Sequence, residues 1–123
     1  MNEQTKHDLE AYCTYLGWVD FFEEGGTIYA IPPGDASHGY EDVPRFDHDL
    51  NLIVAEVAKL DDVSQKLYFA NLVKVLGIAI DETREWPCKW WELLKAVSQA
   101  PAAPRLRALV LTLGLGGPEA DGG

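Results

Sequence analysis

The chain has 123 residues, 47% of them hydrophobic, and this length and composition suit one packed domain and argue against an intrinsically disordered chain. Its formal net charge is −10, and the excess is confined to residues 1–62, which carry 14 acidic and three basic side chains, whereas residues 63–123 carry six acidic and seven basic ones. Direct binding to a nucleic-acid backbone is disfavoured because phosphates need a basic footprint; the acidic half favours a basic partner or serves solubility alone.

The first predicted element is a helix that ends at Gly17. Asp8 and Glu10 fall outside its buried face, which is marked by apolar residues at helical spacing, namely Leu9, Tyr12, Cys13 and Leu16. A β-hairpin follows, because two aromatic and β-branched runs, 18–24 and 27–31, flank a Gly-Gly pair that favours a primed turn. Since an isolated hairpin is marginal in water, we expect one face of it to pack on helices.

Residues 33–46 are rich in polar and turn-forming residues, and we predict an ordered loop there. Asp47 or Asp49 then caps a helix, whose predicted apolar stripe consists of Leu50, Ile53, Val54, Val57 and Leu60. Asp61 and Asp62 break this helix. Another helix is predicted from Ser64 to Gly77, with an apolar set made of Leu67, Phe69, Leu72, Val73 and Leu76.

Residues 78–87 are ambiguous between a short strand and a frayed helix end, and a helix is predicted after Pro87, with a shared face of Trp90, Leu94 and Val97. The last helix is predicted from Pro104 to a cap at Gly114, with a stripe formed by Leu106, Leu109, Val110 and Leu113. Together these elements predict a single α+β domain over residues 1–115: an N-terminal helix, a β-hairpin, then three to four helices packed on a small antiparallel sheet. Residues 116–123 have little to bury, and we predict a disordered tail.

We expect the protein to work in a cytoplasm. The polar start, residues 1–4, lacks the basic-then-apolar pattern of a signal peptide, and no apolar run approaches the roughly 20 residues that a membrane span needs. The two cysteines, Cys13 and Cys88, are too few for the disulfide framework of a small secreted domain. We interpret both as buried, reduced thiols.

The sequence carries no local motif for catalysis. It lacks a phosphate-binding glycine loop, a serine nucleophile elbow and cysteine or histidine pairs at zinc-binding spacing. We therefore expect a non-enzymatic protein with no catalytic residue, cofactor or metal.

The densest group of acidic and imidazole side chains lies between residues 35 and 49 and comprises Asp35, His38, Glu41, Asp42, Asp47, His48 and Asp49. Such a group could hold a divalent metal or supply an acid/base pair, but the simpler interpretation is a helix cap within a solvated loop. The tryptophans at 86, 90 and 91 suit either a core or an exposed contact surface, and Trp90 and Trp91 lie about 100° apart on a helix. Our candidate partner-binding residues are Asp35, Glu41, Asp42, Asp47, Asp49 and Trp91.

Three segments in order carry a family resemblance. Tyr15-Leu16-Gly17-Trp18 follows the first helix, Val43-Pro44-Arg45-Phe46-Asp47-His48-Asp49-Leu50-Asn51 enters a helix, and residues 98–108 lead into Leu111-Thr112-Leu113-Gly114-Leu115. Over most of residues 9–115 the chain resembles the phage ABA-sandwich family of small phage and prophage proteins. It departs from the family pattern at Pro101 and Pro104 and lacks the usual aromatic after Leu115. The resemblance implies a phage accessory protein in an infected bacterial cytoplasm, and it brings no catalytic residues.

The leading hypothesis is a phage-encoded acidic accessory protein that binds a basic host protein and catalyses no reaction. The acidic segment from Asp20 to Asp62 would be its contact surface, and the protein would act as a nucleic-acid-mimicking inhibitor of a defence or nucleic-acid-processing protein. It would bind neither nucleic acid nor membrane directly. Two alternatives stay open: a metal- or small-ligand-binding domain that uses the Asp35–Asp49 loop, and a self-assembling structural protein, such as a homodimer with contacts at residues 86–91.

Overall fold

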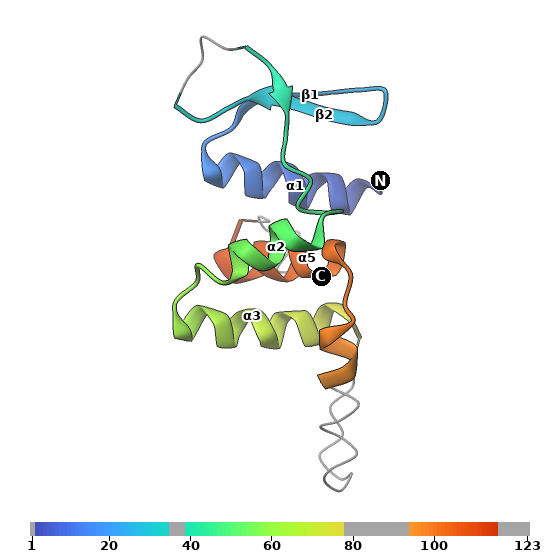
Figure 1. The fold of residues 1–123 in the computed structure, drawn as a ribbon, viewed down its shortest axis with the longest axis vertical. Helices are drawn as coiled ribbons and strands as arrows, with labels where there is room; N and C mark the ends of the chain where they lie inside the picture. Colours follow the sequence, from blue (N-terminus) through green and yellow to red (C-terminus); the bar gives the residue numbers. More distant parts are fainter. Residues whose placement is uncertain (1, 35–38, 78–93, 116–123) are drawn as a thin grey trace, which may run out of the picture.

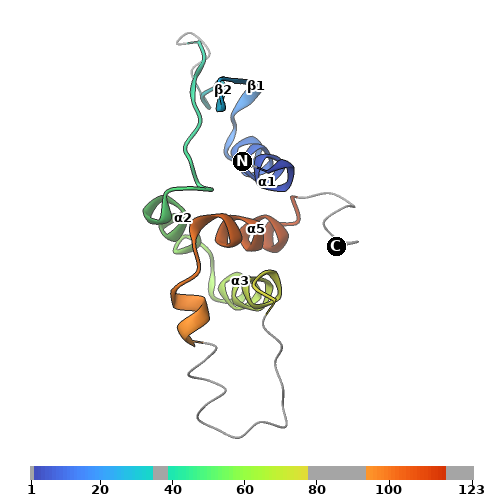
Figure 2. The same cartoon turned by 90° about the vertical axis from the view of Figure 1, so that its right-hand side faces the viewer.

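The computed structural model describes residues 2–34, 39–77 and 94–115 and confirms the α+β class. In chain order the elements are α1 (Glu3–Leu16), β1 (Val19–Glu24), β2 (Thr27–Ile31), β3 (Glu41–Asp42), α2 (Leu50–Val57), α3 (Asp62–Val75) and α5 (Ala102–Leu113), with further helical residues at 94–98. Figures 1 and 2 show these elements stacked in layers: the sheet, then α1, then α2 with α5, then α3. The described helices therefore all lie on one side of the sheet, and α1 is the one next to it.

Helix α1 begins and ends where its local sequence requires. The Asn2 side chain caps it by accepting a hydrogen bond from the Thr5 amide at 2.7 Å, and Gly17 ends it in the left-handed conformation, with φ of 108°. A Cβ at position 17 would lie 2.8 Å from the Pro33 Cβ. Glycine is thus required twice here, by its backbone angle and by the close approach of the chain that follows the hairpin.

The hairpin is confirmed, and it belongs to a three-stranded antiparallel sheet in the order β1-β2-β3. Gly25 and Gly26 both have positive φ, 61° and 82°, as a type I′ turn requires. The third strand differs from the ordered loop predicted over residues 33–46: residues 41 and 42 pair with Ala30 and Tyr29. A strand of two residues is too short to show the alternation by which a strand is recognised in a sequence. Residues 35–38 lie outside the described part.

Strand β1 contains a bulge at Asp20. The pairing of Val19 with Ile31 and of Phe22 with Tyr29 leaves one extra residue on β1, and Asp20 has φ of 59°. Among the described residues it is the one non-glycine with positive φ. Aspartate tolerates this conformation better than most residues, but a Cβ there still costs free energy.

This strain predicts opposite effects of two small substitutions. Asp20→Gly should raise the free energy of unfolding by up to about 1 kcal/mol, because glycine adopts positive φ without a steric cost, whereas Asp20→Ala should lower it by about 1 kcal/mol. Chemical denaturation of both variants beside the wild type checks the pair. A more stable alanine variant than glycine variant would contradict the assigned backbone conformation.

Helix α5 is the centre of the core. It lies between α1 and α3 and also contacts α2, as Figure 2 shows (α5 in red-orange). Its fully buried face includes three of the four predicted stripe residues, Leu106, Leu109 and Val110. The core around it is completed by Leu9, Tyr12, Cys13, Ile28, Ala30, Val43, Phe46, Ile53, Tyr68, Leu72, Ala100, Ala102 and Ala108.

Two of the predicted apolar faces are wrong in part. On α2 only Ile53 is fully buried, and Leu50 and Val54 are exposed. On α3 the predicted Leu72 and Val73 are buried, but Tyr68 is buried in place of Leu67, which is 49% exposed. Consecutive apolar residues, as at 52–55 and 67–70, fit more than one helical face, so the packing partner decides which of them is covered.

The helix boundaries differ slightly from the prediction. The Asp61 side chain caps α3 by accepting from the Ser64 amide at 2.7 Å, so α3 begins at Asp62 and not at Ser64. Helix α5 begins at Ala102, two residues before Pro104. Proline is tolerated there because amides of a helix's first turn have no intrahelical acceptor. Gly114 ends α5 with φ of 69°, as predicted.

Several predictions fall outside the described residues, among them the ambiguous segment 78–87, the helix start at Pro87, Cys88 and the tail 116–123. No helix in the described ranges combines the length and apolar character that a membrane span requires.

Candidate functional site

Two acidic residues that we expected on a contact surface have structural partners. The Arg45 guanidinium donates to both carboxylate oxygens of Asp47, from Nε to Oδ1 and from Nη2 to Oδ2, each at 2.9 Å, and the Asp47 side chain is only 6% exposed. Asp49 caps α2, because its Oδ1 accepts from the amides of Asn51 and Leu52 at 3.0 and 3.4 Å. The structure thus assigns the cap to Asp49 and gives Asp47 to an ion pair.

The remaining candidate residues divide into two groups. Glu41 and Asp42 are exposed on β3, where neighbouring residues face opposite sides of the sheet. Asp35 and Trp91 lie outside the described residues, as do His38 and the whole 86–91 segment on which self-association was predicted. In the part of the chain that the structure describes, no three histidine, cysteine or carboxylate side chains come together as a metal site would need.

The three bases of residues 1–62 all have acidic partners. Lys6 lies 3.7 Å from Glu23, Arg45 binds Asp47, and Lys59 lies 2.6 Å from Glu56. Glu56 also accepts a hydrogen bond from the Tyr12 hydroxyl at 2.7 Å, which joins α1 to α2. The cations of the first half are therefore used within the fold, and they leave most strand carboxylates without a cation partner among the described residues.

Asp47 and Glu56 predict a loss of stability in acid. Burial acts to raise each pKa, but the hydrogen bonds from Arg45 to Asp47, and from Lys59 and Tyr12 to Glu56, outweigh it and hold both pKa values below the usual 3.8 and 4.5. A lowered folded-state pKa contributes stability that is complete above the unfolded-state value and is lost as the pH falls through the folded-state value. The free energy of unfolding should therefore decline as the pH falls below 4.5 and then below 3.8.

The double variant Asp47→Asn with Glu56→Gln checks this expectation. It should be less stable than wild type near neutral pH and should lose less stability in acid, because the two titrating groups are gone. Denaturant unfolding at a series of pH values measures both curves. Parallel curves for the two proteins would show that acid sensitivity arises from other groups.

The outer side of the sheet, which faces away from α1, holds a cluster of three aromatic rings. Phe22 stacks on Tyr29 with ring centroids 5.2 Å apart and contacts Tyr40 edge-on at 4.9 Å. The register places Phe22 and Tyr29 directly opposite each other, on the side away from buried Ile28 and Ala30. Phe22 is 40% exposed and Tyr40 52% exposed. No described helix covers this side (Figures 1 and 2).

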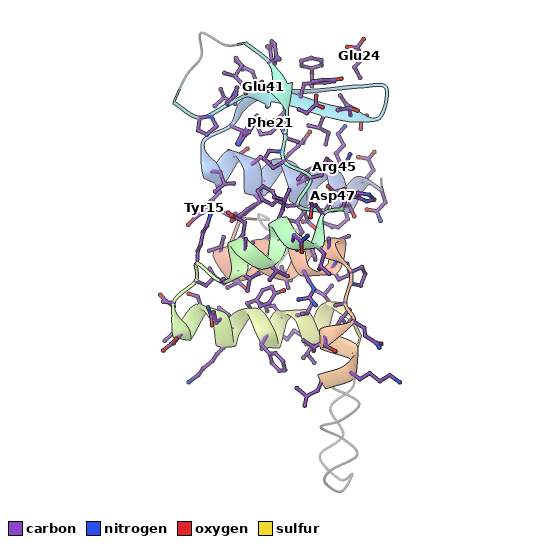
Figure 3. All side chains as sticks on the ribbon, in the orientation of Figure 1. Tyr15, Phe21, Glu24, Glu41, Arg45 and Asp47 are labelled. Atoms are coloured by element: carbon purple, nitrogen blue, oxygen red, sulfur yellow. The ribbon has the colours of Figure 1, made fainter. Side chains whose placement is uncertain are left out.

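Carboxylates border this aromatic cluster. Asp42 is paired with Tyr29, and Glu24, two residues after Phe22, is paired with Thr27, so both acids share the outer side. Figure 3 shows Glu24 above the sheet, whereas Phe21 points from β1 toward α1. The three strands carry five acidic residues and no basic one, and of these acids Glu23 is bound by Lys6 of α1. We call the surface formed by Phe22, Tyr29, Tyr40, Glu24 and Asp42 the aromatic-acidic face.

Sequence reasoning missed the aromatic half of this face. The hairpin register, once the Gly-Gly turn is fixed, already makes Phe22 and Tyr29 cross-strand neighbours, so this pair could have been read from the sequence. Tyr40 gave no such indication, because it precedes a strand that was not predicted.

Two buried groups elsewhere in the fold, a carboxylate and a thiol, have structural roles. Asp8, which the sequence placed outside the buried face of α1, is 2% exposed and accepts from Arg107 of α5 at 3.1 Å and from Gln4 at 3.0 Å. Cys13 is buried as predicted, and burial raises the pKa of its thiol to about 12. A thiol with so high a pKa is a poor nucleophile near neutral pH.

Comparison of the chain with models of protein families, with curated proteins and with solved structures found no match. The resemblance to the phage ABA-sandwich family therefore stays a prediction, and the functional argument depends on the chain's own geometry.

Proposed function

We propose that this protein is a non-enzymatic binding module that holds a basic partner protein on the aromatic-acidic face of its sheet. The observation that carries the proposal is the cluster of Phe22, Tyr29 and Tyr40, in which Phe22 and Tyr40 are exposed; Glu24 and Asp42 border it, and the three strands hold no base. Exposed aromatic clusters are typical of contact surfaces, since rings supply large buried area at low entropic cost. The surrounding acids would steer a basic surface into contact.

The proposal narrows the contact surface expected from the sequence. Asp8, Asp47 and Glu56 are held in ion pairs inside the fold, and Asp49, Asp61 and Asp62 lie at the starts of α2 and α3. The distribution of carboxylates in the acidic half therefore fits a small contact face better than a long row of carboxylates that would imitate nucleic acid. The host setting, a phage accessory protein bound to a bacterial protein, rests on the family resemblance alone.

Matched charge variants test the proposal. The probe is a short peptide that alternates arginine, lysine and glycine, titrated at low ionic strength by isothermal calorimetry. Glu24→Gln with Asp42→Asn should weaken binding about fivefold, since two charge contacts are lost, and should flatten the salt dependence. The control, Glu3→Gln with Asp62→Asn, removes the same charge from the first turns of α1 and α3 and should change the affinity by less than about twofold. Equal weakening in both variants would mean that the peptide responds to net charge and would contradict a site on the sheet.

A further inference from the structure

We infer that the aromatic-acidic face selects arginine over lysine in its basic partner. This inference rests on the proposed function and adds to it the kind of side chain that is recognised. A partner with a flexible, arginine-containing segment is the occupant that fits the face, because the face offers aromatic rings and carboxylates together.

Arginine and lysine differ in what they gain from such a surface. A guanidinium is planar and weakly hydrated, so it stacks on aromatic rings and forms two parallel hydrogen bonds to one carboxylate. A lysine ammonium is compact and strongly hydrated, and it gains mainly from the charge. Carboxylates alone would hold both side chains, whereas carboxylates beside open rings favour arginine.

The register supplies the required spacing. Phe22, Tyr29 and Asp42 lie opposite one another in one row across the three strands. Adjacent strands are about 4.8 Å apart, so the Asp42 carboxylate lies beside the Tyr29 ring, within reach of a guanidinium stacked on the cluster. Glu24 is two residues from Phe22 on the same side and offers a second carboxylate toward the hairpin turn.

The rings are held in place before a partner arrives. Phe22 stacks on Tyr29 and contacts Tyr40 edge-on, yet Phe22 and Tyr40 keep 40% and 52% of their surfaces exposed. The rings therefore lose little side-chain conformational entropy when a partner binds.

The sheet edges suit a partner strand less well than this face does. The β1 edge is interrupted by the bulge at Asp20, and β3 spans two residues only. Bulges and acidic side chains at an edge oppose the addition of another strand. Contact through the face therefore fits the observations better than extension of the sheet.

Two peptides of equal length and charge test the selectivity, one alternating arginine with glycine and the other lysine with glycine. Wild-type protein should bind the arginine peptide about fivefold more tightly. The double variant Phe22→Leu with Tyr40→Leu keeps the charge and much of the apolar volume. It should abolish the preference by lowering the affinity for the arginine peptide. Tyr15→Leu, which removes an exposed ring from α1, is the matched control and should leave the preference unchanged.

The outcomes separate this inference from the proposed function. Equal affinity for the two peptides, with both weakened by Glu24→Gln and Asp42→Asn, would overturn the arginine preference and leave the binding face intact. If the preference survives the double leucine substitution, the peptide's arginine side chains are recognised outside the aromatic cluster, and the inference is overturned. Insensitivity of both peptides to the carboxylate variants would overturn the proposed function as well. Melting curves of each variant establish that the fold is retained.

Discussion

Leu106→Ala should lower the free energy of unfolding by about 3–4 kcal/mol, because it leaves a cavity at a fully buried position of the central helix. Leu106 lies on α5, which separates α1 from α3 and also contacts α2, so the neighbouring side chains are held by three elements and collapse poorly into the space. Urea denaturation followed by circular dichroism measures the change.

Leu67→Ala is the matched control, since it removes the same atoms from a side chain of α3 that is 49% exposed. Its cost should stay within about 0.5 kcal/mol. Comparable losses for the two variants would contradict the layered packing in which α5 is the central element.

Arg107→Met should cost about 3–5 kcal/mol near neutral pH, because it leaves the Asp8 carboxylate buried without its ionic partner. Replacing both members, Asp8→Leu with Arg107→Met, should recover most of that loss, since the buried charge is removed together with its partner. A double variant less stable than the single one would contradict the assigned pairing between α1 and α5.

The pH dependence of Arg107→Met follows from Asp8. Burial raises the Asp8 pKa above the usual 3.8 even though Arg107 lowers it, so the cost of burial outweighs the ion pair. A raised folded-state pKa contributes stability that is complete below the unfolded-state value and is lost as the pH rises through the folded-state value. Without Arg107 the pKa rises further, so the variant's deficit should be smaller in mild acid than at neutral pH. An equal deficit at both pH values would mean that Asp8 does not titrate in the folded protein.

Local sequence rules predicted the elements whose ends are fixed by single residues. Gly17 and Gly114 end their helices, and the Gly25-Gly26 pair sets the hairpin register. These positions were predictable because positive φ is restricted mainly to glycine, whatever packs around it.

Features set by distant contacts were not predictable from the sequence. Asp8 is separated from Arg107 by 99 residues, and only the contact between α1 and α5 explains why a carboxylate lies in the core. By sequence, Asp47 and Asp49 are equal candidates for the α2 cap, and the pairing of Asp47 with Arg45 decides between them. On α3, the choice of Tyr68 over Leu67 as the buried residue depends on the position of α5.

The candidate site shows the same division. Of its two carboxylates, Asp42 was predicted from charge and is exposed on β3, whereas Glu24 was not among the candidate residues and joins the face through the hairpin register. The aromatic rings that give the face its character come together only once β3 pairs with β2 and brings Tyr40 against Phe22.

The most direct test of the central claim is a map of amide chemical-shift changes in the ¹⁵N-labelled protein during titration with the arginine-glycine peptide. Binding at the aromatic-acidic face predicts changes concentrated in β1, β2 and residues 39–43, with α3 and α5 unaffected, and predicts their loss in the Glu24→Gln, Asp42→Asn variant. Changes centred on α2 or α3, or spread evenly over the acidic residues of every element, would contradict it.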